Sequence, residues 1–205
     1  MRLKIKKYDE YDFRTRHALE YSIWEDEHLK SDVQEALLKI AENFIDFLKL
    51  GLTIKDIKDI QLTGSLANYN YTKYSDLDLH ILFDFDEIID DERLVKEFLM
   101  SKKVLWNNSY SIKIKGWEVE IYPQNIKEKH ISTGVYSVLN DEWIKKPKEP
   151  TKVWATTNLA DIKKKVKEIK YEIDNIDQLE DSENTISRVK EKIKNMRQSG
   201  LESGG

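Results

Sequence analysis

The chain has 205 residues, of which 40% are hydrophobic and 35% charged, and its formal net charge is −4. These values are typical of a globular protein with one sizeable core, and they exclude disordered, collagen-like and low-complexity classes. The absence of cysteine excludes disulfides, thiolate metal sites and cysteine nucleophiles. No apolar run reaches the roughly 20 residues that span a bilayer, and no secretory signal is visible, so we expect a cytoplasmic protein without a membrane partner.

The first part of the chain predicts a short strand followed by two helices. We expect the strand at residues 2–6 and the first helix at residues 14–29. The second helix has its N-cap at Ser31 and Asp32 and stops at Gly51. The apolar residues that we expect these helices to bury are Leu19, Ile23 and Trp24 in the first, and Val33, Leu37, Ile40, Ala41, Phe44 and Leu48 in the second.

The middle of the chain predicts a small sheet. A helix at residues 92–102 follows an acidic stretch, and a tight turn at Gly116 joins two of the strands. The segment HISTGVYSVLNDEWI, residues 130–144, favours no single element. The four expected strands are residues 59–62, 76–83, 109–115 and 117–122.

The last part of the chain predicts two charged amphipathic helices, residues 159–176 and 185–196, beyond a KKPKEP linker at residues 145–150. The order of helices, sheet and helices indicates an α+β fold, with a small mixed or antiparallel sheet flanked by helices and a C-terminal helical hairpin. The parts that we expect are a domain at 1–144, a hairpin at 151–198 packed on it, and a flexible tail at 199–205.

Two aspartates interrupt the apolar run of the strand expected at residues 76–83. Successive side chains of a strand point to opposite faces, so Asp76 and Asp78 share one face while the leucines and isoleucine between and after them face the core. Two adjacent carboxylates repel each other unless a cation lies between them or one is protonated. Oxygen ligands suit Mg²⁺ or Mn²⁺ together with substrate phosphates, so the pair predicts a metal site for phosphoryl transfer.

A Gly-Ser pair ends the preceding strand. Gly64 lets backbone N–H groups approach a phosphate closely, and the Ser65 hydroxyl can donate to it as well. Lys73 is either a further phosphate contact or ordinary loop surface, and the tyrosines around it either stack on a base or pack within the loop. With the metal carboxylates, these residues predict a site for a nucleoside triphosphate.

A third carboxylate is expected from the strand WEVEIYPQ, residues 117–124. Glu118 and Glu120 lie on one face of this strand, and the apolar residues between and beside them lie on the other. We favour Glu120, because apolar neighbours flank it most symmetrically, and Glu118 stays the alternative.

These motifs resemble the signature of nucleotidyltransferases that have the palm of DNA polymerase beta. The match consists of GS at residues 64–65, ten intervening residues and DLDL at residues 76–79. EIYP at residues 120–123 is similar to the third element of oligoadenylate-synthase-like members, although most relatives have Asp in place of this Glu. The resemblance covers roughly residues 58–123 and implies a palm-like sheet. Residues 130–144 also resemble a segment of small, uncharacterised nucleotidyltransferase-like proteins from phages.

The resemblance implies an enzyme that moves a nucleoside monophosphate from an NTP, such as ATP, to an acceptor hydroxyl and releases pyrophosphate. It implies that Gly64 and Ser65 hold the β and γ phosphates. Asp76 and Asp78 would bind two Mg²⁺, and Glu120 would complete the ligands of the second ion and help to deprotonate the acceptor. The acceptor is a small molecule, a protein side chain or an RNA end.

Other features leave alternatives open. The lysine-rich segment 144–170 is either a solvated helix face or a phosphate-facing surface, which keeps RNA among the acceptors. His80 either orients a substrate or is a hydrogen-bonded structural residue, and the HIST segment at residues 130–133 either binds phosphate or is structural. The main alternative to an enzyme is a catalytically inactive nucleotide-binding or regulatory protein, such as an antitoxin-like partner, with the same fold.

Overall fold

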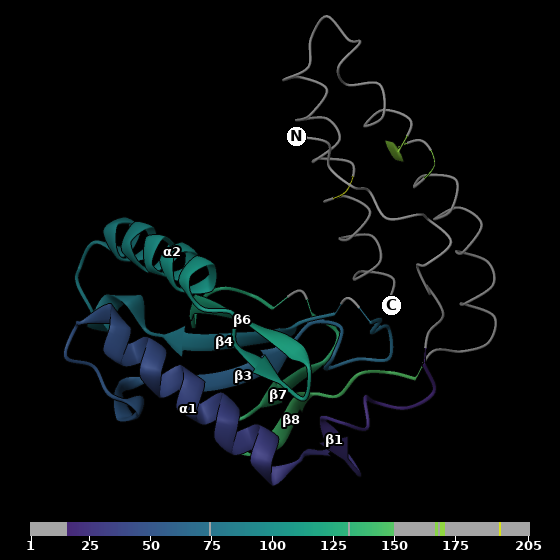
Figure 1. The fold of residues 1–205 in the computed structure, drawn as a ribbon. Coiled ribbons are helices and arrows are strands. Elements are labelled where there is room, and N and C mark those ends of the chain that lie inside the picture. The colour runs from purple at the N-terminus through teal and green to yellow at the C-terminus, as the bar shows by residue number, and fades with distance from the viewer. Residues whose placement is uncertain are drawn as a thin grey trace, which may run out of the picture. The chain divides into compact units, whose positions relative to one another are not determined.

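The computed structural model describes residues 16–73, 75–130 and 132–149, together with residues 167, 169, 170 and 193. Residues Arg16–Lys148 form one compact unit, in which helices pack on a mixed sheet (Figure 1). The expected α+β class is therefore confirmed for this unit. The strand expected at residues 2–6 and the tail expected at 199–205 lie outside the described residues. Of the expected hairpin only residues 167, 169, 170 and 193 are described, all as helix, so the strand, the hairpin, the tail and the division into domains stay predictions.

The sheet of this unit has six strands in the order β5–β6–β4–β3–β7–β8. Neighbouring strands are antiparallel except β4 and β6, which are parallel because the chain crosses over between them through a helix. The sheet is thus mixed, one of the two arrangements expected. The strand bounds are β3 Asp59–Thr63, β4 Leu77–Phe83, β5 Lys113–Ile114, β6 Trp117–Asn125, β7 Val135–Ser137 and β8 Glu142–Lys145.

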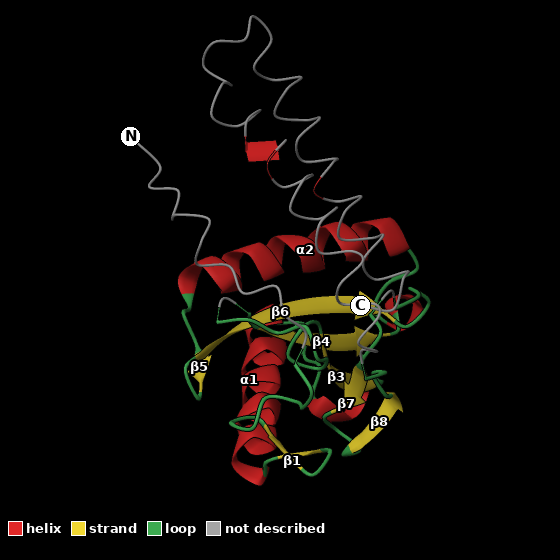
Figure 2. Cartoon of the chain, turned by 90° about the vertical axis from the view of Figure 1, so that its right-hand side faces the viewer, coloured by secondary structure: helices red, strands yellow, loops and turns green. Residues whose placement is uncertain are grey.

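Two helices, α1 (Ser31–Leu48) and α2 (Glu92–Ser109), pack on one face of the sheet. Figure 2 shows α2 next to β6, with β5 and β8 at the two margins of the sheet. The helices contact each other through aromatic side chains, with the rings of Phe44 and Trp106 edge to face at 5.5 Å between centroids. This layer buries the apolar stripe that the sequence predicts for α1.

The ends of α1 differ slightly from the expectation. The N-cap is Lys30, and Ser31 lies inside the first turn, where its hydroxyl donates to the Glu35 carboxylate at 3.3 Å. At the other end the chain leaves the helix at Lys49, which has a left-handed φ of +58°, two residues before the expected stop at Gly51. The expected position of the helix is confirmed, and its expected N-cap is wrong by one residue.

The helix expected before α1 is wrong over its described residues, which form turns and a small hairpin. Trp24 explains the difference, because its indole N–H donates to the carbonyl of Leu66 at 2.7 Å and its ring stacks on Trp143 at 4.8 Å. These contacts with residues far along the chain outweigh local helix propensity. Trp24 and Ile23 are buried as predicted. The hairpin strands are β1 Trp24–Glu25 and β2 His28–Leu29.

The two faces of the sheet differ in chemistry. Along β4, Leu77, Leu79 and Ile81 are fully buried against the helices, whereas Asp78 and His80 are half-buried on the opposite face. The strand register aligns further polar side chains with them. This polar face carries Asp59, Gln61 and Thr63 from β3, Asp78 and His80 from β4, Glu120, Tyr122 and Gln124 from β6, and Ser137 from β7.

Helix α2 is longer than expected and sets the geometry of β6. Because α2 continues to Ser109, the strand that follows it is shorter than the expected residues 109–115 and consists only of β5. Near its end, the Asn107 amide donates to the carbonyl of Ile121 at 3.1 Å and accepts from the N–H of the same residue at 3.2 Å. Asn107 thus pairs with the edge of β6 as a neighbouring strand would.

The remaining elements are short. The ambiguous segment 130–144 forms β7 and most of β8, joined by a turn at residues 138–141. Among the described residues, no helix combines the length and apolarity needed to cross a bilayer. The short 3-10 helices are η2 Ile54–Asp56 and η3 Phe85–Glu87.

Candidate active site

Three carboxylates converge on the polar face of the sheet. Asp76 directly precedes β4, Asp78 is its second residue, and Glu120 lies beside Asp78 on β6, where the two are Cα partners. Each of the three offers one oxygen, and these oxygens all lie within 4.8 Å of one another. All three side chains are half-buried, so their mutual repulsion is screened less than it would be on an open surface.

Oxygens at this spacing suit a hard divalent cation. Carboxylates are the ligands that Mg²⁺ and Mn²⁺ prefer, and a cation between them offsets the like charges. We call Asp76, Asp78 and Glu120 the acidic triad. Glu118, the alternative third carboxylate, lies outside this group: its side chain is 64% exposed, 3.6 Å from the Lys113 ammonium, and it accepts from the Ser111 hydroxyl.

Gly64 supports the triad from the end of β3. Its φ is +77°, a backbone conformation that side-chain-bearing residues rarely adopt. A Cβ built on Gly64 would lie 1.8 Å from Oδ2 of Asp78. The backbone at Gly64 therefore lies directly against the Asp78 carboxylate, in space that only glycine leaves open.

The loop between Gly64 and the aspartates is held by several hydrogen bonds. The hydroxyl of Ser65 donates to that of Ser75 at 2.7 Å, and the Ser75 oxygen also accepts from the backbone N–H of Thr72. Tyr69 is only 8% exposed, and its carbonyl accepts from the N–H of Arg16 at 2.6 Å. The Tyr69 side chain therefore packs in the loop, which was one of the two roles considered for the loop tyrosines.

The other loop residues considered for binding lie in different surroundings. Lys73 is exposed, and Tyr71 is half-buried with the Arg16 guanidinium 5.6 Å from its ring centroid. Tyr74 is outside the described residues. In the HIST segment, the Ser132 hydroxyl donates to the carbonyl of Gly134 and Thr133 accepts from the Asn68 amide, so both take part in loop packing.

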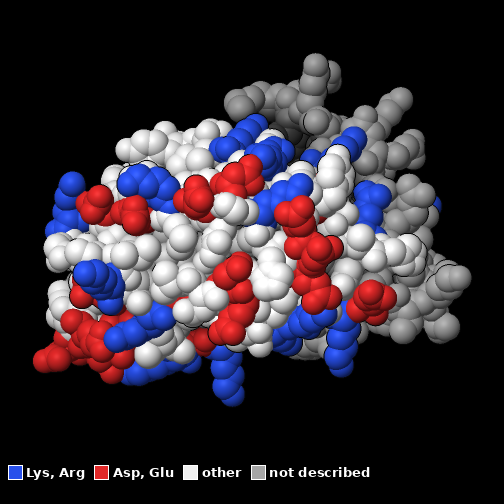
Figure 3. All heavy atoms as spheres, turned by 90° about the horizontal axis from the view of Figure 1, so that it is seen from below, with Lys and Arg blue, Asp and Glu red and all other residues white. Residues whose placement is uncertain are grey.

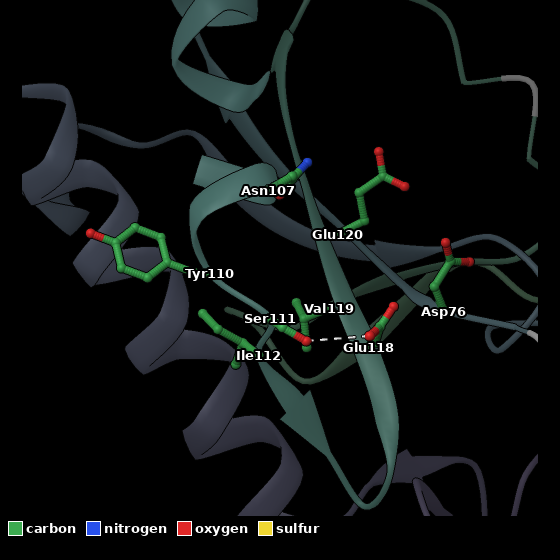
Figure 4. A pocket seen from close by; sticks show the side chains of 8 residues that line it. All are labelled: Asp76, Asn107, Tyr110, Ser111, Ile112, Glu118, Val119 and Glu120. Atoms are coloured by element: carbon green, nitrogen blue, oxygen red, sulfur yellow. Dashed lines mark hydrogen bonds between the residues drawn. The ribbon is translucent and has the colours of Figure 1, made fainter. Parts of the chain in front are cut away.

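A cavity of about 250 Å³ opens beside the triad. Figure 4 shows that Asp76, Glu118 and Glu120 point to one side of β6, while residues from the end of α2 lie on the other side. Because Asp76 and Glu120 belong both to the triad and to the cavity wall, a molecule in the cavity would touch the triad. The residues that line it are Asp76, Asn107, Tyr110, Ser111, Ile112, Glu118, Val119 and Glu120.

His80 lies on the same face, two residues beyond Asp78. Its Nδ1 is 2.6 Å from the side-chain oxygen of Gln124, which matches the structural role considered for it. Burial lowers the pKa of His80 from its ordinary value of 6.5 to about 4, so the ring is neutral at pH 7. The ring of His130 lies 5.5 Å away, and burial lowers its pKa as well. Its Nε2 has no hydrogen-bond partner among the described residues.

We expect half-buried His80 to make the metal-free protein sensitive to acid. Because the pKa of His80 is lower in the folded chain than in the unfolded one, the unfolded state binds the proton first, and stability falls as pH drops from 6.5 towards 4. The free energy of unfolding should decrease by about 2 kcal/mol between pH 7 and pH 5 on account of this group. Urea denaturation in EDTA at both pH values should give a correspondingly flatter pH dependence for His80→Gln. The control, exposed His17→Gln, should keep the wild-type dependence, and equal slopes for all three proteins would contradict this account.

The sequence analysis missed one charged residue of the site. Lys103 of α2 lies 3.2 Å from Glu120, measured from Nζ to Oε1. A signal was present, because Lys103 falls on the helical stripe of the buried residues Leu99 and Trp106, where a lysine is unusual. Periodicity could not distinguish it from Lys102, which is also on that side of the helix.

Comparison with known proteins agrees with the geometry. A family model of the nucleotidyltransferase domain matches residues 38–199, which include the whole acidic triad, Gly64 and α2. No curated protein and no solved structure matches the chain. The match covers most of the sequence and confirms the family that the GS, DLDL and EIYP motifs indicate. The chain therefore belongs to the nucleotidyltransferase domain family, and the matched residues include the three carboxylates that could hold a metal ion.

Proposed function

We propose that this protein transfers a nucleoside monophosphate from an NTP to an acceptor hydroxyl and releases pyrophosphate. The observation that carries the proposal is the convergence of Asp76, Asp78 and Glu120 within 4.8 Å, with the Gly64 backbone directly against Asp78. All three donor groups are carboxylate oxygens, which fit Mg²⁺ or Mn²⁺, so the triad would hold such a cation. When bound, the cations supply charge stabilisation for the transferred phosphoryl group.

The residues of the chain contribute positioning. In this proposal the backbone N–H groups after Gly64 donate to phosphate oxygens, exposed Lys73 is a further contact, and the Ser65 hydroxyl turns from Ser75 to donate to the phosphate as well. β4 and β6 hold Asp78 and Glu120 in register, so the carboxylates need little rearrangement before the reaction. Glu120 lines the cavity together with Asp76, and we assign to Glu120 the role of accepting the proton of an acceptor hydroxyl bound there.

The cavity favours a small neutral or cationic acceptor over the phosphate backbone of RNA. Three of its eight described lining residues are acidic and none of the eight is Lys or Arg. Among the described residues on the face of the molecule shown in Figure 3, basic and acidic side chains are interspersed and form no broad basic surface for a polyanion. The volume of about 250 Å³ suits a compact polyhydroxyl molecule or one side chain of a protein.

The test is pyrophosphate release from each of the four NTPs with Mg²⁺ or Mn²⁺. The acceptors to compare are total RNA, neutral polyhydroxyl compounds and amine-bearing polyhydroxyl compounds. We expect release that requires the metal and is stimulated by the small compounds rather than by RNA. Metal-dependent nucleotide binding without release from any mixture would favour the alternative, a catalytically inactive nucleotide-binding protein.

Glu120 and Glu118 give a matched pair of variants. Glu120→Gln should lower pyrophosphate release by at least roughly 100-fold, because it removes a ligand from the triad. It should also reduce the rise in melting temperature that Mn²⁺ produces, whereas Glu118→Gln should keep that rise because this side chain lies outside the triad. Glu142→Gln, at an exposed position of β8, controls for the loss of one negative charge. If Glu118→Gln instead abolished the rise in melting temperature with Mn²⁺, Glu118 and not Glu120 would be the third metal ligand.

A further inference from the structure

Lys103 differs from the other lysines that form ion pairs in the described part of the chain. Its side chain is 22% exposed, whereas the lysines of the other described pairs are between 38% and 69% exposed. Its ammonium lies 3.2 Å from Glu120 and 4.7 Å from the centroid of the Tyr122 ring. The stem of Lys103 is thus largely covered while its charge is directed at the third carboxylate of the triad.

This contact places a positive charge beside one carboxylate of the triad. In the absence of a divalent cation, the ammonium offsets part of the repulsion that Glu120 experiences from Asp76 and Asp78. A cation bound by the triad acts on the same carboxylate with twice the charge. The ammonium and the metal therefore compete for Glu120, and the Tyr122 ring offers the displaced ammonium a partner within reach.

We propose that Lys103 is a positioning residue that holds Glu120 in the metal-free protein and releases it when a divalent cation binds. The proposal rests on the proposed function in one respect, namely that the triad is the metal site. Lys103 sets the affinity for the cation, since a metal ion that takes Glu120 as a ligand must replace the Lys103–Glu120 ion pair. The ion pair keeps Glu120 in place before the metal binds, and it lowers the affinity for the metal.

The first experiment measures Mn²⁺ binding by calorimetry without nucleotide. Lys103→Met keeps the length of the stem and removes the charge, so Mn²⁺ should bind roughly fivefold more tightly than to the wild type. Lys103→Arg keeps the ion pair and should bind Mn²⁺ within about twofold of the wild type. Lys102→Met is the matched control, because this neighbour lies over Phe47 and Phe98 instead of Glu120 and should leave the affinity unchanged.

The Glu120→Gln background separates competition from a general field effect. If Lys103 acts through Glu120, adding Lys103→Met to Glu120→Gln should not change Mn²⁺ affinity further. A field effect of the missing positive charge would persist in both backgrounds, and that result would overturn the proposal. Equal or weaker Mn²⁺ binding by Lys103→Met alone would overturn it as well.

The melting temperature with and without Mn²⁺ gives a second test, which distinguishes a role in metal binding from a merely structural role of Lys103. In EDTA, Lys103→Met should melt a few degrees below the wild type, and saturating Mn²⁺ should remove most of that difference. A deficit that Mn²⁺ leaves unchanged would show that Lys103 only supports the fold, contrary to the proposal. The failure of this proposal can be distinguished from the failure of the proposed function. Tighter Mn²⁺ binding by Lys103→Met without any pyrophosphate release by the wild type would contradict only the transferase function. Pyrophosphate release together with an unchanged Mn²⁺ affinity of Lys103→Met would contradict only the role of Lys103.

Discussion

Asp78→Asn should reduce pyrophosphate release by roughly 10³-fold while leaving the protein folded. The substitution keeps the shape of the side chain but removes one negative charge from the triad. Asp78 is the Cα partner of Glu120, and its carboxylate lies directly against the backbone of Gly64. Because an amide is a much weaker ligand for Mg²⁺ or Mn²⁺ than a carboxylate, the metal-dependent rise in melting temperature should disappear together with the activity. Steady-state kinetics and thermal melts with and without Mn²⁺ measure both effects.

The control for this prediction is Asp90→Asn, which removes one carboxylate from an exposed position in the acidic stretch. It should retain activity and the response to Mn²⁺, which would show that the loss at Asp78 depends on place and not on net charge. Circular dichroism should give the same spectrum for all three proteins. Substantial activity in Asp78→Asn, under conditions where the wild type turns over, would rule out the triad as the catalytic site.

Gly64→Ala is the second variant for which we expect a large effect. Its Cβ would come within 1.8 Å of the Asp78 carboxylate, so either this carboxylate or the Gly64 backbone must move. A displacement of about 1 Å at a catalytic group can cost roughly 100-fold in rate, so we expect a loss of that size in pyrophosphate release. Weaker Mn²⁺ binding should accompany it, because Asp78 belongs to the triad.

The left-handed backbone at Gly64 contributes a separate effect on stability. An alanine at φ +77° should lower the free energy of unfolding by about 1 kcal/mol or somewhat more, as measured by urea denaturation. Gly51→Ala is the matched control, because Gly51 has a φ of +73° and no described atom lies within 4 Å of a Cβ built there. It should lose similar stability and keep full activity. Equal activity losses in both variants would show that strain, and not contact with Asp78, explains the effect.

These two variants test one physical idea, which is that the sheet places the carboxylates before any ligand arrives. Asp78 is held by pairing on both sides, since Thr63 of β3 and Glu120 of β6 are its Cα partners. The Asn107 amide fixes the outer edge of β6 next to Glu120. A site built on paired strands in this way needs less rearrangement than one built on loops.

The sequence by itself determined the α+β class, the alternation along β4 and the nucleotidyltransferase family. Alternation is a local property: Leu77 and Leu79 must be buried, so Asp78 must face the other way. The spacing between the Gly-Ser pair and the aspartates is likewise local, because it depends on one loop between two adjacent antiparallel strands. The alternation and the spacing could therefore be predicted without knowledge of the contacts between segments that are distant in the sequence.

Only the tertiary structure decided which residues join the aspartates. The choice of Glu120 over Glu118 depends on the register between β4 and β6, whose paired residues are 42 positions apart in the sequence and joined through α2. The hairpin at Trp24 replaced an expected helix because Leu66 and Trp143 provide partners that local propensity cannot reveal. Lys103 was missed for the same reason: its spacing from Leu99 and Trp106 indicates the inner side of α2, but only the packing of α2 on β6 brings its ammonium to Glu120.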